Sequence, residues 1–304
     1  MTHVSDRVRA ACARVAGLAR SVAIDEEEAE AYADGLTWTG KTGSHPVEGA
    51  REARAAFVVC LDAINFGSGW WPTIRKRPGH SGYATIEACL LDRFRAGGAW
   101  SAEELRQLSA ADLAAVTGQD ADHPLMGQYA AALRDVGARV LAEHGGSFEA
   151  VVDAADGSAL ALADLLAGWD AFADVSTYDG EPAPFFKRAQ IAAADVDRMG
   201  VADLGGEERL TAFADNLVPH VLRVDGVLRL DPELERRIDA GELLVHGSPE
   251  EVELRACAVH AVELLAAAMH GRLSPAQIDA ALWNRGRAPR YKSRPRPRCR
   301  NTAY

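Results

Sequence analysis

The segment LTAFADNLVPH, residues 210–220, places a single carboxylate, Asp215, within an apolar run. The spacing of the apolar residues predicts a helix that ends before Pro219 and buries Phe213. Asp215 would lie off the buried face in the last turn, where the negative end of the helix dipole raises the pKa of a carboxylate. A carboxylate with a perturbed pKa is a candidate for acid–base chemistry, and the alternative is an ordinary exposed aspartate.

A second segment has the pattern of an anion site. In APFFKRAQI, residues 183–191, Pro184 stands where a helix would begin, which puts Lys187 near the first turn. Free backbone N–H groups, the helix dipole and a lysine together favour an anion such as phosphate. The alternative is a solvated pair of basic side chains, Lys187 and Arg188, on an amphipathic helix.

Basic residues concentrate near the C-terminus. Residues 285–300, RGRAPRYKSRPRPRCR, hold eight basic residues and no acidic one. In an extended chain Arg294, Arg296, Arg298 and Arg300 would share one face. That face could bind phosphate, neutralise the acidic body of the protein, or belong to a disordered arm, which a tail position favours.

The stretch LDAINFGSGWWPT, residues 61–73, joins a helical pattern to a glycine-rich loop with adjacent tryptophans. Phe66, Trp70 and Trp71 could stack on a flat heterocycle, and Asn65 could read the edge of a base. The alternative is that the tryptophans cap a hydrophobic core.

Other patterns exclude function classes. Residues 35–42, GLTWTGKT, match the phosphate-loop motif, but an acidic helical segment precedes them where the motif needs a strand, so we interpret the match as coincidence. The histidines form no clustered ligand set and the five cysteines form no CxxC pair, so we expect no metal and no cofactor. The formal net charge of −11 disfavours a stable nucleic-acid partner. Without a signal peptide or a membrane-spanning run, the sequence predicts a cytoplasmic protein.

The elements that must hold these residues are helical. Apolar residues recur three and four apart over six segments, namely residues 4–22, 47–64, 83–94, 125–142, 148–155 and 159–169. Capping boxes at Ser101, Ser248 and Ser274 predict three further helix starts. Residues 220–230 predict a short hairpin around an Asp–Gly turn. In the helix after Ser248, Glu251 and Arg255 are interpreted as a surface ion pair of the scaffold.

We therefore expect an all-α protein with at most a short β-hairpin. A single domain over residues 1–304 is predicted, with two possible lobes joined around residues 147–180 and a basic tail at residues 285–304.

Taken in order, the segments resemble the queuosine salvage protein family, the queuosine 5′-phosphate N-glycosylase/hydrolases. The resemblance rests on LDAINF followed by WW, and on FFKRAQI, LTAFADNLVPHVLRVDGVL, GSPEEVELRAC and YKSRPRPRCR, and it spans nearly the whole chain. It implies a helical fold similar to the helix-hairpin-helix DNA glycosylases. It also implies hydrolysis of the N-glycosidic bond of queuosine 5′-monophosphate to queuine and ribose 5-phosphate.

The resemblance also suggests roles for the residues. Asp215 would be the catalytic carboxylate that stabilises a cationic sugar and orients or deprotonates water. Lys187, with Arg298 or Arg300, would hold the 5′-phosphate. The remaining candidates would bind the base and its ammonium side chain, and they are Asn65, Phe66, Trp70, Trp71, Phe213 and Asp279.

Three motifs depart from the family pattern. The spacing NF-C-F-W becomes NFGSGWW, the tyrosine after FAD is Asn216, and H-R-T-R becomes P-R-C-R with Pro297 and Cys299. Alternatives in the same enzyme class are another modified purine 5′-nucleotide or a nucleoside as substrate. An alternative from a different class is a non-catalytic nucleotide-binding or RNA-binding protein.

Overall fold

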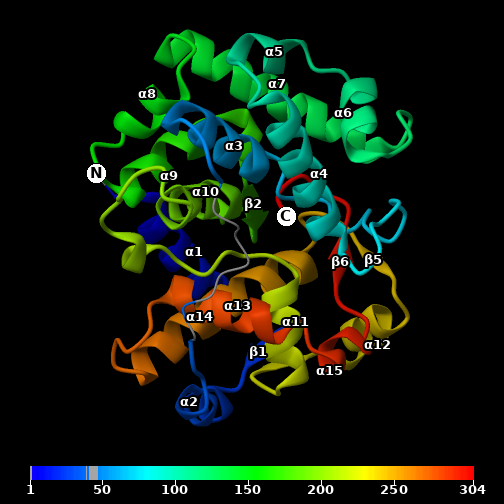
Figure 1. Ribbon diagram of the computed structural model, residues 1–304. Coiled ribbons are helices and arrows are strands. Elements are labelled where there is room, and N and C mark those ends of the chain that lie inside the picture. Colours follow the sequence, from blue (N-terminus) through cyan, green and yellow to red (C-terminus); the bar gives the residue numbers. More distant parts are fainter. Residues whose placement is uncertain (1, 39, 41–46) are drawn as a thin grey trace. The chain divides into compact units, whose positions relative to one another are not determined.

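The structure is a computed structural model that describes residues 2–38, 40 and 47–304 (Figure 1). Helices dominate the described residues and the strands are short, which confirms the prediction of a helical fold. The chain divides into two compact units. The first comprises Met1–Gly43, Asp174–Gln190 and Gly206–Arg300, and the second comprises Ser44–Ala173, Ile191–Gly205 and Asn301–Tyr304.

The first unit is built around the long helix α13 (Pro249–Ala268). Helices α1 (Val4–Leu18), α2 (Glu26–Asp34), α11 (Leu217–Val224) and α14 (Pro275–Arg285) pack on it. Most residues of α13 are buried, so the helix is the core of this unit. Two shorter helices, α12 (Pro232–Asp239) and α15 (Pro289–Lys292), complete the helices of the unit.

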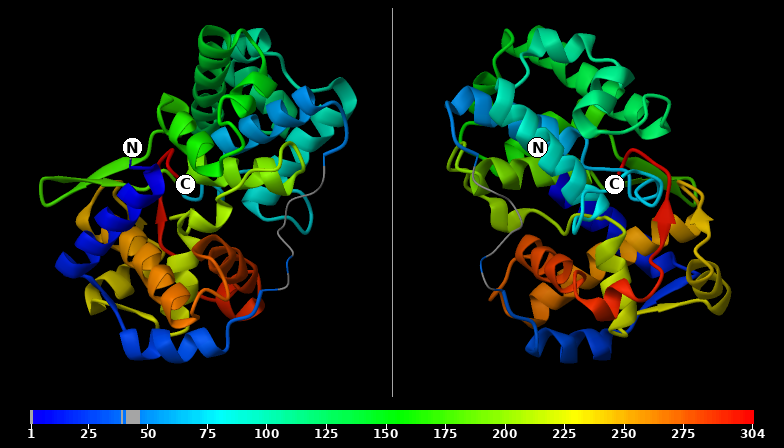
Figure 2. Two further views of the ribbon diagram at one scale, coloured as in Figure 1. Left: turned by 90° about the vertical axis from the view of Figure 1, so that its left-hand side faces the viewer. Right: turned by 45° about the vertical axis from the view of Figure 1, so that its right-hand side comes forward.

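Three two-stranded sheets also belong to the first unit. Strand β1 (Val22–Ile24) pairs antiparallel with β4 (Leu228–Leu230), and β5 (Leu243–Leu244) pairs parallel with β6 (Arg298–Cys299). Strands β2 (Val175–Tyr178) and β3 (Glu181–Pro184) form a hairpin that is drawn as a narrow ribbon in the left view of Figure 2. Its turn residues Asp179 and Gly180 both have positive φ, as a two-residue hairpin turn requires.

The second unit is organised around α7 (Pro124–His144). Helices α3 (Arg51–Ala63), α5 (Ala102–Gln107), α6 (Ala110–Thr117) and α8 (Phe148–Asp153) pack on it. Gly137 explains the close approach of α7 to α5, because a Cβ at this position would lie 2.6 Å from the carbonyl oxygen of Ala102. Helices α4 (Gly82–Gly97) and α9 (Ala159–Ala167) complete the unit, together with most of α10 (Lys187–Arg198).

The periodic segments are helical as predicted, with ends that differ by a few residues. Full capping boxes form at Ser101 and Ser274. Ser248 also caps its helix, but the carboxylate of Glu251 accepts from the backbone N–H of Gly247 (3.0 Å), so the predicted reciprocal bond to Ser248 is replaced.

The hairpin predicted over residues 220–230 is wrong. Residues 217–224 form helix α11, because apolar residues recur there with the helical period and only β4 remains extended. A helix, α2, precedes the phosphate-loop-like residues 35–42, as the coincidental interpretation requires. Thr39, Lys41 and Thr42 of that motif lie outside the described residues. No helix of the described chain is both long and apolar enough to cross a membrane.

Candidate active site

Asp215 lies on an irregular segment, residues 211–216, that leads into α11. Its carboxylate oxygen Oδ1 accepts the backbone N–H groups of Leu217 (2.8 Å) and Val218 (2.9 Å). The predicted position in a last helical turn is therefore wrong. Pro219 lies in the first turn of α11, where backbone N–H groups have no acceptor within the helix, so a proline without an N–H is tolerated. The helix therefore begins after Asp215 instead of ending there.

The pKa of Asp215 is raised, as predicted, but the predicted cause is wrong. Partial burial of the carboxylate raises this pKa most. The positive charge of Lys187, the two N–H donors of α11 and the charge of Arg296 oppose the shift. The positive end of the α11 dipole also favours the charged form, in contrast to the sequence-based expectation. Asp215 thus combines a partly desolvated negative charge with nearby cations.

Side chains from distant parts of the chain fix the backbone around Asp215. The amide side chain of Gln190 exchanges two hydrogen bonds with Thr211, at 3.0 Å to its N–H and 2.9 Å to its hydroxyl oxygen. The carboxylate of Asp279 accepts the N–H of Phe213 (2.9 Å). Because a buried loop has no helical or sheet partners, these bonds define its path.

Two more bonds flank the carboxylate directly. The guanidinium of Arg255 donates to the carbonyl oxygen of Ala214 (3.1 Å), one residue before Asp215. The side chain of Asn216, one residue after it, donates to the carbonyl oxygen of Pro297 (2.8 Å). The residue that carries the charge is therefore held on both sides.

Arg255 also forms a buried, bidentate ion pair with Asp174, with N–O distances of 2.9 and 2.7 Å. Its guanidinium lies 3.9 Å from the ring centroid of Phe185. The predicted surface pair between Glu251 and Arg255 is wrong, because both side chains are buried and Arg255 binds Asp174. Sequence reasoning missed this pair because its members are 81 positions apart.

Lys187 is the first residue of α10, as the prediction of a first-turn position requires, although Pro184 lies in β3. The lysine is buried, and its charge acts on Asp215. Its backbone N–H donates to Asp174 (3.1 Å), so this N–H already has an anionic partner. The part of the predicted anion site that acts on Asp215 is the charge of the Lys187 ammonium group, which lowers the pKa of this carboxylate.

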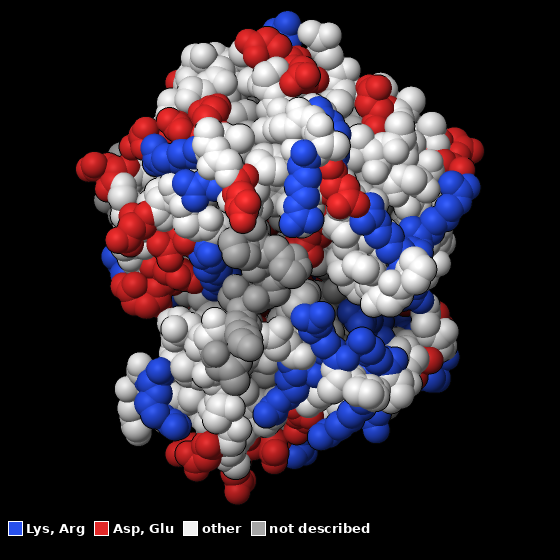
Figure 3. Space-filling view, in the orientation of Figure 1, with Lys and Arg blue, Asp and Glu red and all other residues white. Residues whose placement is uncertain are grey.

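The basic tail is folded in the structure. It forms α15 and β6, and Arg298 donates to the carbonyl oxygen of Gly241 (3.1 Å), whereas Arg300 is exposed. The tail residue whose charge acts on Asp215 is Arg296, which was predicted to share the basic face of the tail but was not among the residues assigned to the 5′-phosphate. Figure 3 shows basic side chains gathered over the region of α15, where the exposed basic residues are Arg287, Arg290, Lys292 and Arg294.

The aromatic candidates Phe66, Trp70 and Trp71 belong to the second unit, as does Asn65. Phe66 and Trp70 are buried, and the Phe66 ring packs edge-on against Tyr129 with centroids 5.0 Å apart. Trp71 packs on Gly82, where a Cβ would lie 2.3 Å from the indole ring.

The other six predicted site residues share the first unit. Within it, Asp215 and Lys187 interact, Phe213 and Asp279 are bonded, and Arg298 and Arg300 lie on or next to β6. The carboxylate of Asp279 is thus hydrogen-bonded to the backbone of the segment that contains Asp215. The side chain of Asn65 donates to Asp62 (3.2 Å) within the second unit.

Comparisons with known proteins identify the family of this chain. The family model described as queuosine salvage protein matches residues 44–304. A protein of Sphaerobacter thermophilus named queuosine 5′-phosphate N-glycosylase/hydrolase is 35% identical over 266 residues, which cover 84% of this chain and 82% of that protein. Proteins of the same name from Dictyostelium discoideum and Mus musculus are each 28% identical, over 83% and 77% of this chain and 79% and 75% of their own lengths. The chain belongs to the queuosine salvage protein family.

Proposed function

We propose that this protein hydrolyses the N-glycosidic bond of queuosine 5′-phosphate and releases queuine and ribose 5-phosphate. The names of the relatives support this reaction, and each similarity extends over most of this chain and most of the relative. The observation that carries the proposal is the carboxylate of Asp215, partly desolvated, fixed on both sides and close enough to Lys187 for their charges to interact.

In this proposal the carboxylate of Asp215 stabilises the reacting sugar. An N-glycosidic bond breaks through a sugar with the character of an oxocarbenium ion, which a nearby carboxylate stabilises. The same carboxylate orients or deprotonates the attacking water, and a raised pKa makes it a better base. A 7-deazapurine lacks N7 as a proton acceptor, so stabilisation of the sugar must supply much of the reduction in the barrier.

The cations near Asp215 suit the 5′-phosphate. Lys187 would bind it, and Arg296 is a stronger candidate from the tail than Arg298, whose guanidinium donates to Gly241, or Arg300, which is exposed. Binding energy from the phosphate would then hold the sugar against the carboxylate. The aromatic residues Phe66, Trp70 and Phe213 remain proposed contacts of the base.

The proposed setting is the cytoplasm. All five cysteines are buried and none forms a disulfide, which fits a reducing compartment. The partner we propose is a small nucleotide, with no cofactor and no stable nucleic-acid complex.

The test is to incubate the purified protein with queuosine 5′-monophosphate and to follow free queuine by chromatography. Asp215→Asn should lower the rate at least ~100-fold, the scale expected for loss of a catalytic carboxylate. Asp231→Asn is the matched control, because Asp231 also accepts a backbone N–H at a helix start (2.9 Å) but is exposed. It should keep the wild-type rate.

The outcomes separate the alternatives. If the folded wild-type protein releases no queuine, the substrate is wrong, and other modified purine 5′-nucleotides and unphosphorylated queuosine are tested next. If Asp215→Asn works as fast as the wild type, Asp215 is not the catalytic carboxylate.

A further inference from the structure

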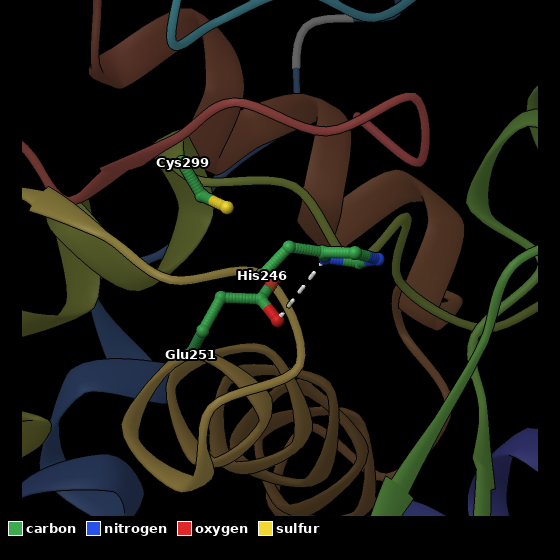
Figure 4. A group of neighbouring side chains, drawn as sticks. All are labelled: His246, Glu251 and Cys299. Carbon is green, nitrogen blue, oxygen red and sulfur yellow. Dashed lines mark ion pairs between the residues drawn. The ribbon is translucent and has the colours of Figure 1, made fainter.

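His246, Glu251 and Cys299 form a compact group in the first unit, apart from the residues to which we assign a role in the reaction. His246 lies in the loop between β5 and α13, Glu251 in the first turn of α13, and Cys299 in β6 (Figure 4). One potential ligand atom from each residue lies within 4.8 Å of the other two. A thiol, an imidazole and a carboxylate are thus brought together although Glu251 and Cys299 are far apart in the sequence.

From this group we propose a binding site for a divalent transition-metal ion of the zinc type. Zinc is bound in proteins by cysteine sulfur, histidine nitrogen and carboxylate oxygen, and three such ligands leave one position for water. Softer thiolate and imidazole ligands select against magnesium and calcium, which prefer sites made only of oxygen.

The spacing of the ligand atoms fits such an ion. With metal–ligand distances of 2.0–2.3 Å, a tetrahedral zinc ion places its ligand atoms roughly 3.6 Å apart. Nδ1 of His246 already lies 3.6 Å from Oε2 of Glu251. The ligand atoms of the three residues all lie within 4.8 Å of one another, so the most distant pair would have to approach by at most about 1 Å to bind one ion. His246 can make this movement because it lies on a loop and its side chain is 46% exposed.

Glu251 gives a second, independent indication. Its side chain is 1% exposed, and its oxygen Oε1 has no hydrogen-bond partner among the described residues. A buried carboxylate oxygen without a partner is costly, and a bound cation removes that cost. In Figure 4 this carboxylate points toward His246, and the sulfur of Cys299 points toward the space between the three side chains.

The electrostatics around His246 agree with a site for a positive charge. The carboxylate of Glu251 lies 3.6 Å from the imidazole of His246, so its negative charge favours a cation between them. Because the thiol and the imidazole must lose their protons to bind a metal, the affinity for the ion should rise with pH. The exposed face of His246 provides a path for the ion from solvent.

A metal ion bound here would link β6, near the C-terminus, to the start of α13. Cys299 belongs to β6, and β6 is held otherwise by its short pairing with β5 and by the bond from Arg298 to Gly241. Bound metal would therefore stabilise the folded first unit, because the three ligands come together only when β6 is in place.

The test uses the 304-residue chain without a polyhistidine tag, first stripped of metal by a chelator. Cobalt(II) is added as a spectroscopic probe, since a cysteine thiolate bound to cobalt gives a charge-transfer band. Zinc affinity is measured by competition with a chromophoric chelator. We expect binding of a single equivalent, a thiolate band with cobalt, and a higher melting temperature with zinc.

Cys299→Ser should abolish the thiolate band and weaken zinc binding by at least ~100-fold, since changes beyond the ligands themselves already cost 10- to 100-fold. His246→Ala, at an exposed loop position, should weaken binding similarly and does not threaten the core. The controls are His260→Ala, on α13 with Glu251, and Cys89→Ser, in the second unit, and both should bind like the wild type.

The proposal is overturned if the wild type shows no thiolate band with cobalt and no zinc binding at about micromolar concentrations. It is also overturned if Cys299→Ser binds zinc as the controls do. Metal binding is measured without a nucleotide, so neither result depends on whether the protein hydrolyses queuosine 5′-phosphate.

Discussion

The two segments that carry most of the candidate residues are held in different ways. Residues 211–216 of the first unit have no regular structure, and side chains of Gln190, Arg255 and Asp279 bind their backbone. Residues 65–73 of the second unit are held largely by their own turn, with the N–H groups of Trp70 and Trp71 bonded to the carbonyl oxygen of Gly67, and also by a bond from the Tyr129 hydroxyl to the carbonyl oxygen of Phe66. The segment around the charge thus depends mainly on long-range polar bonds, whereas the large aromatic rings depend mainly on a local turn and on packing.

This difference predicts different sensitivities to mutation. The segment around Asp215 should respond most to the loss of a polar partner, because a buried polar group left without its partner is costly. The aromatic segment should respond most to a change of volume, because its rings fill space in a closely packed interior.

The largest effect is expected for Arg255→Met. The change removes one partner of a buried ion pair and leaves Asp174 without its guanidinium, which typically costs about 3–5 kcal/mol. Equilibrium unfolding in urea measures this loss. Arg236→Met is the control, because Arg236 pairs with Glu233 on the surface and should change the free energy of unfolding by less than about 1 kcal/mol. Equal effects of the two changes would contradict the contrast between the segments.

A smaller effect is expected for Gly82→Ala, which tests the aromatic segment. The added Cβ would lie 2.3 Å from the Trp71 ring, and overpacking of this kind costs about 1–3 kcal/mol. Gly127→Ala is the matched control, because Gly127 is an exposed helical glycine with no atom within 4 Å of an added Cβ. It should stabilise the protein by about 0.4–1 kcal/mol. Opposite signs for the two changes in urea unfolding would support the packing of Trp71, and a stabilising Gly82→Ala would refute it.

The smallest effect on stability concerns Asp215 itself. Burial raises its pKa above the ordinary value of 3.8, so the folded protein binds this proton more tightly than the unfolded chain. Stability therefore falls as the pH rises from the ordinary pKa to the raised one, and the cost is complete above that window. At neutral pH, Asp215→Asn should raise the melting temperature while it lowers activity.

Melting curves of the wild type and of Asp215→Asn across this pH range measure the effect. The two curves should approach each other as the pH falls toward 3.8. A wild-type protein that is more stable than the variant at neutral pH would show that Asp215 is stabilised, not strained, by its surroundings.

Local patterns predicted the helices well because each helix records its period and its caps within its own residues. Ser101 and Ser274 are examples in which the whole capping box lies within four positions. The hairpin was predicted at the wrong Asp–Gly pair, since residues 225–226 follow α11 whereas Asp179–Gly180 forms the turn between β2 and β3. Alternation in VSTY before that second pair was a usable signal.

The surroundings of Asp215 could not be predicted in the same way. Asp279 and Phe213 are 66 positions apart, and nothing in either local sequence indicates their bond. The start of α11 was also hidden, because Pro219 suits both the end of a helix and a first turn. The sequence therefore indicated which carboxylate to consider, and only the structure indicates how it is held.

The burial of every cysteine makes the thiols reporters of local opening. Burial raises the pKa of four of them, to about 12 for Cys257, so in the folded protein they react slowly with alkylating reagents. Labelling must then proceed through transient exposure of the segment that holds each thiol. Mass spectrometry of the labelled peptides would give a separate opening rate for each of five elements, at Cys12, Cys60, Cys89, Cys257 and Cys299.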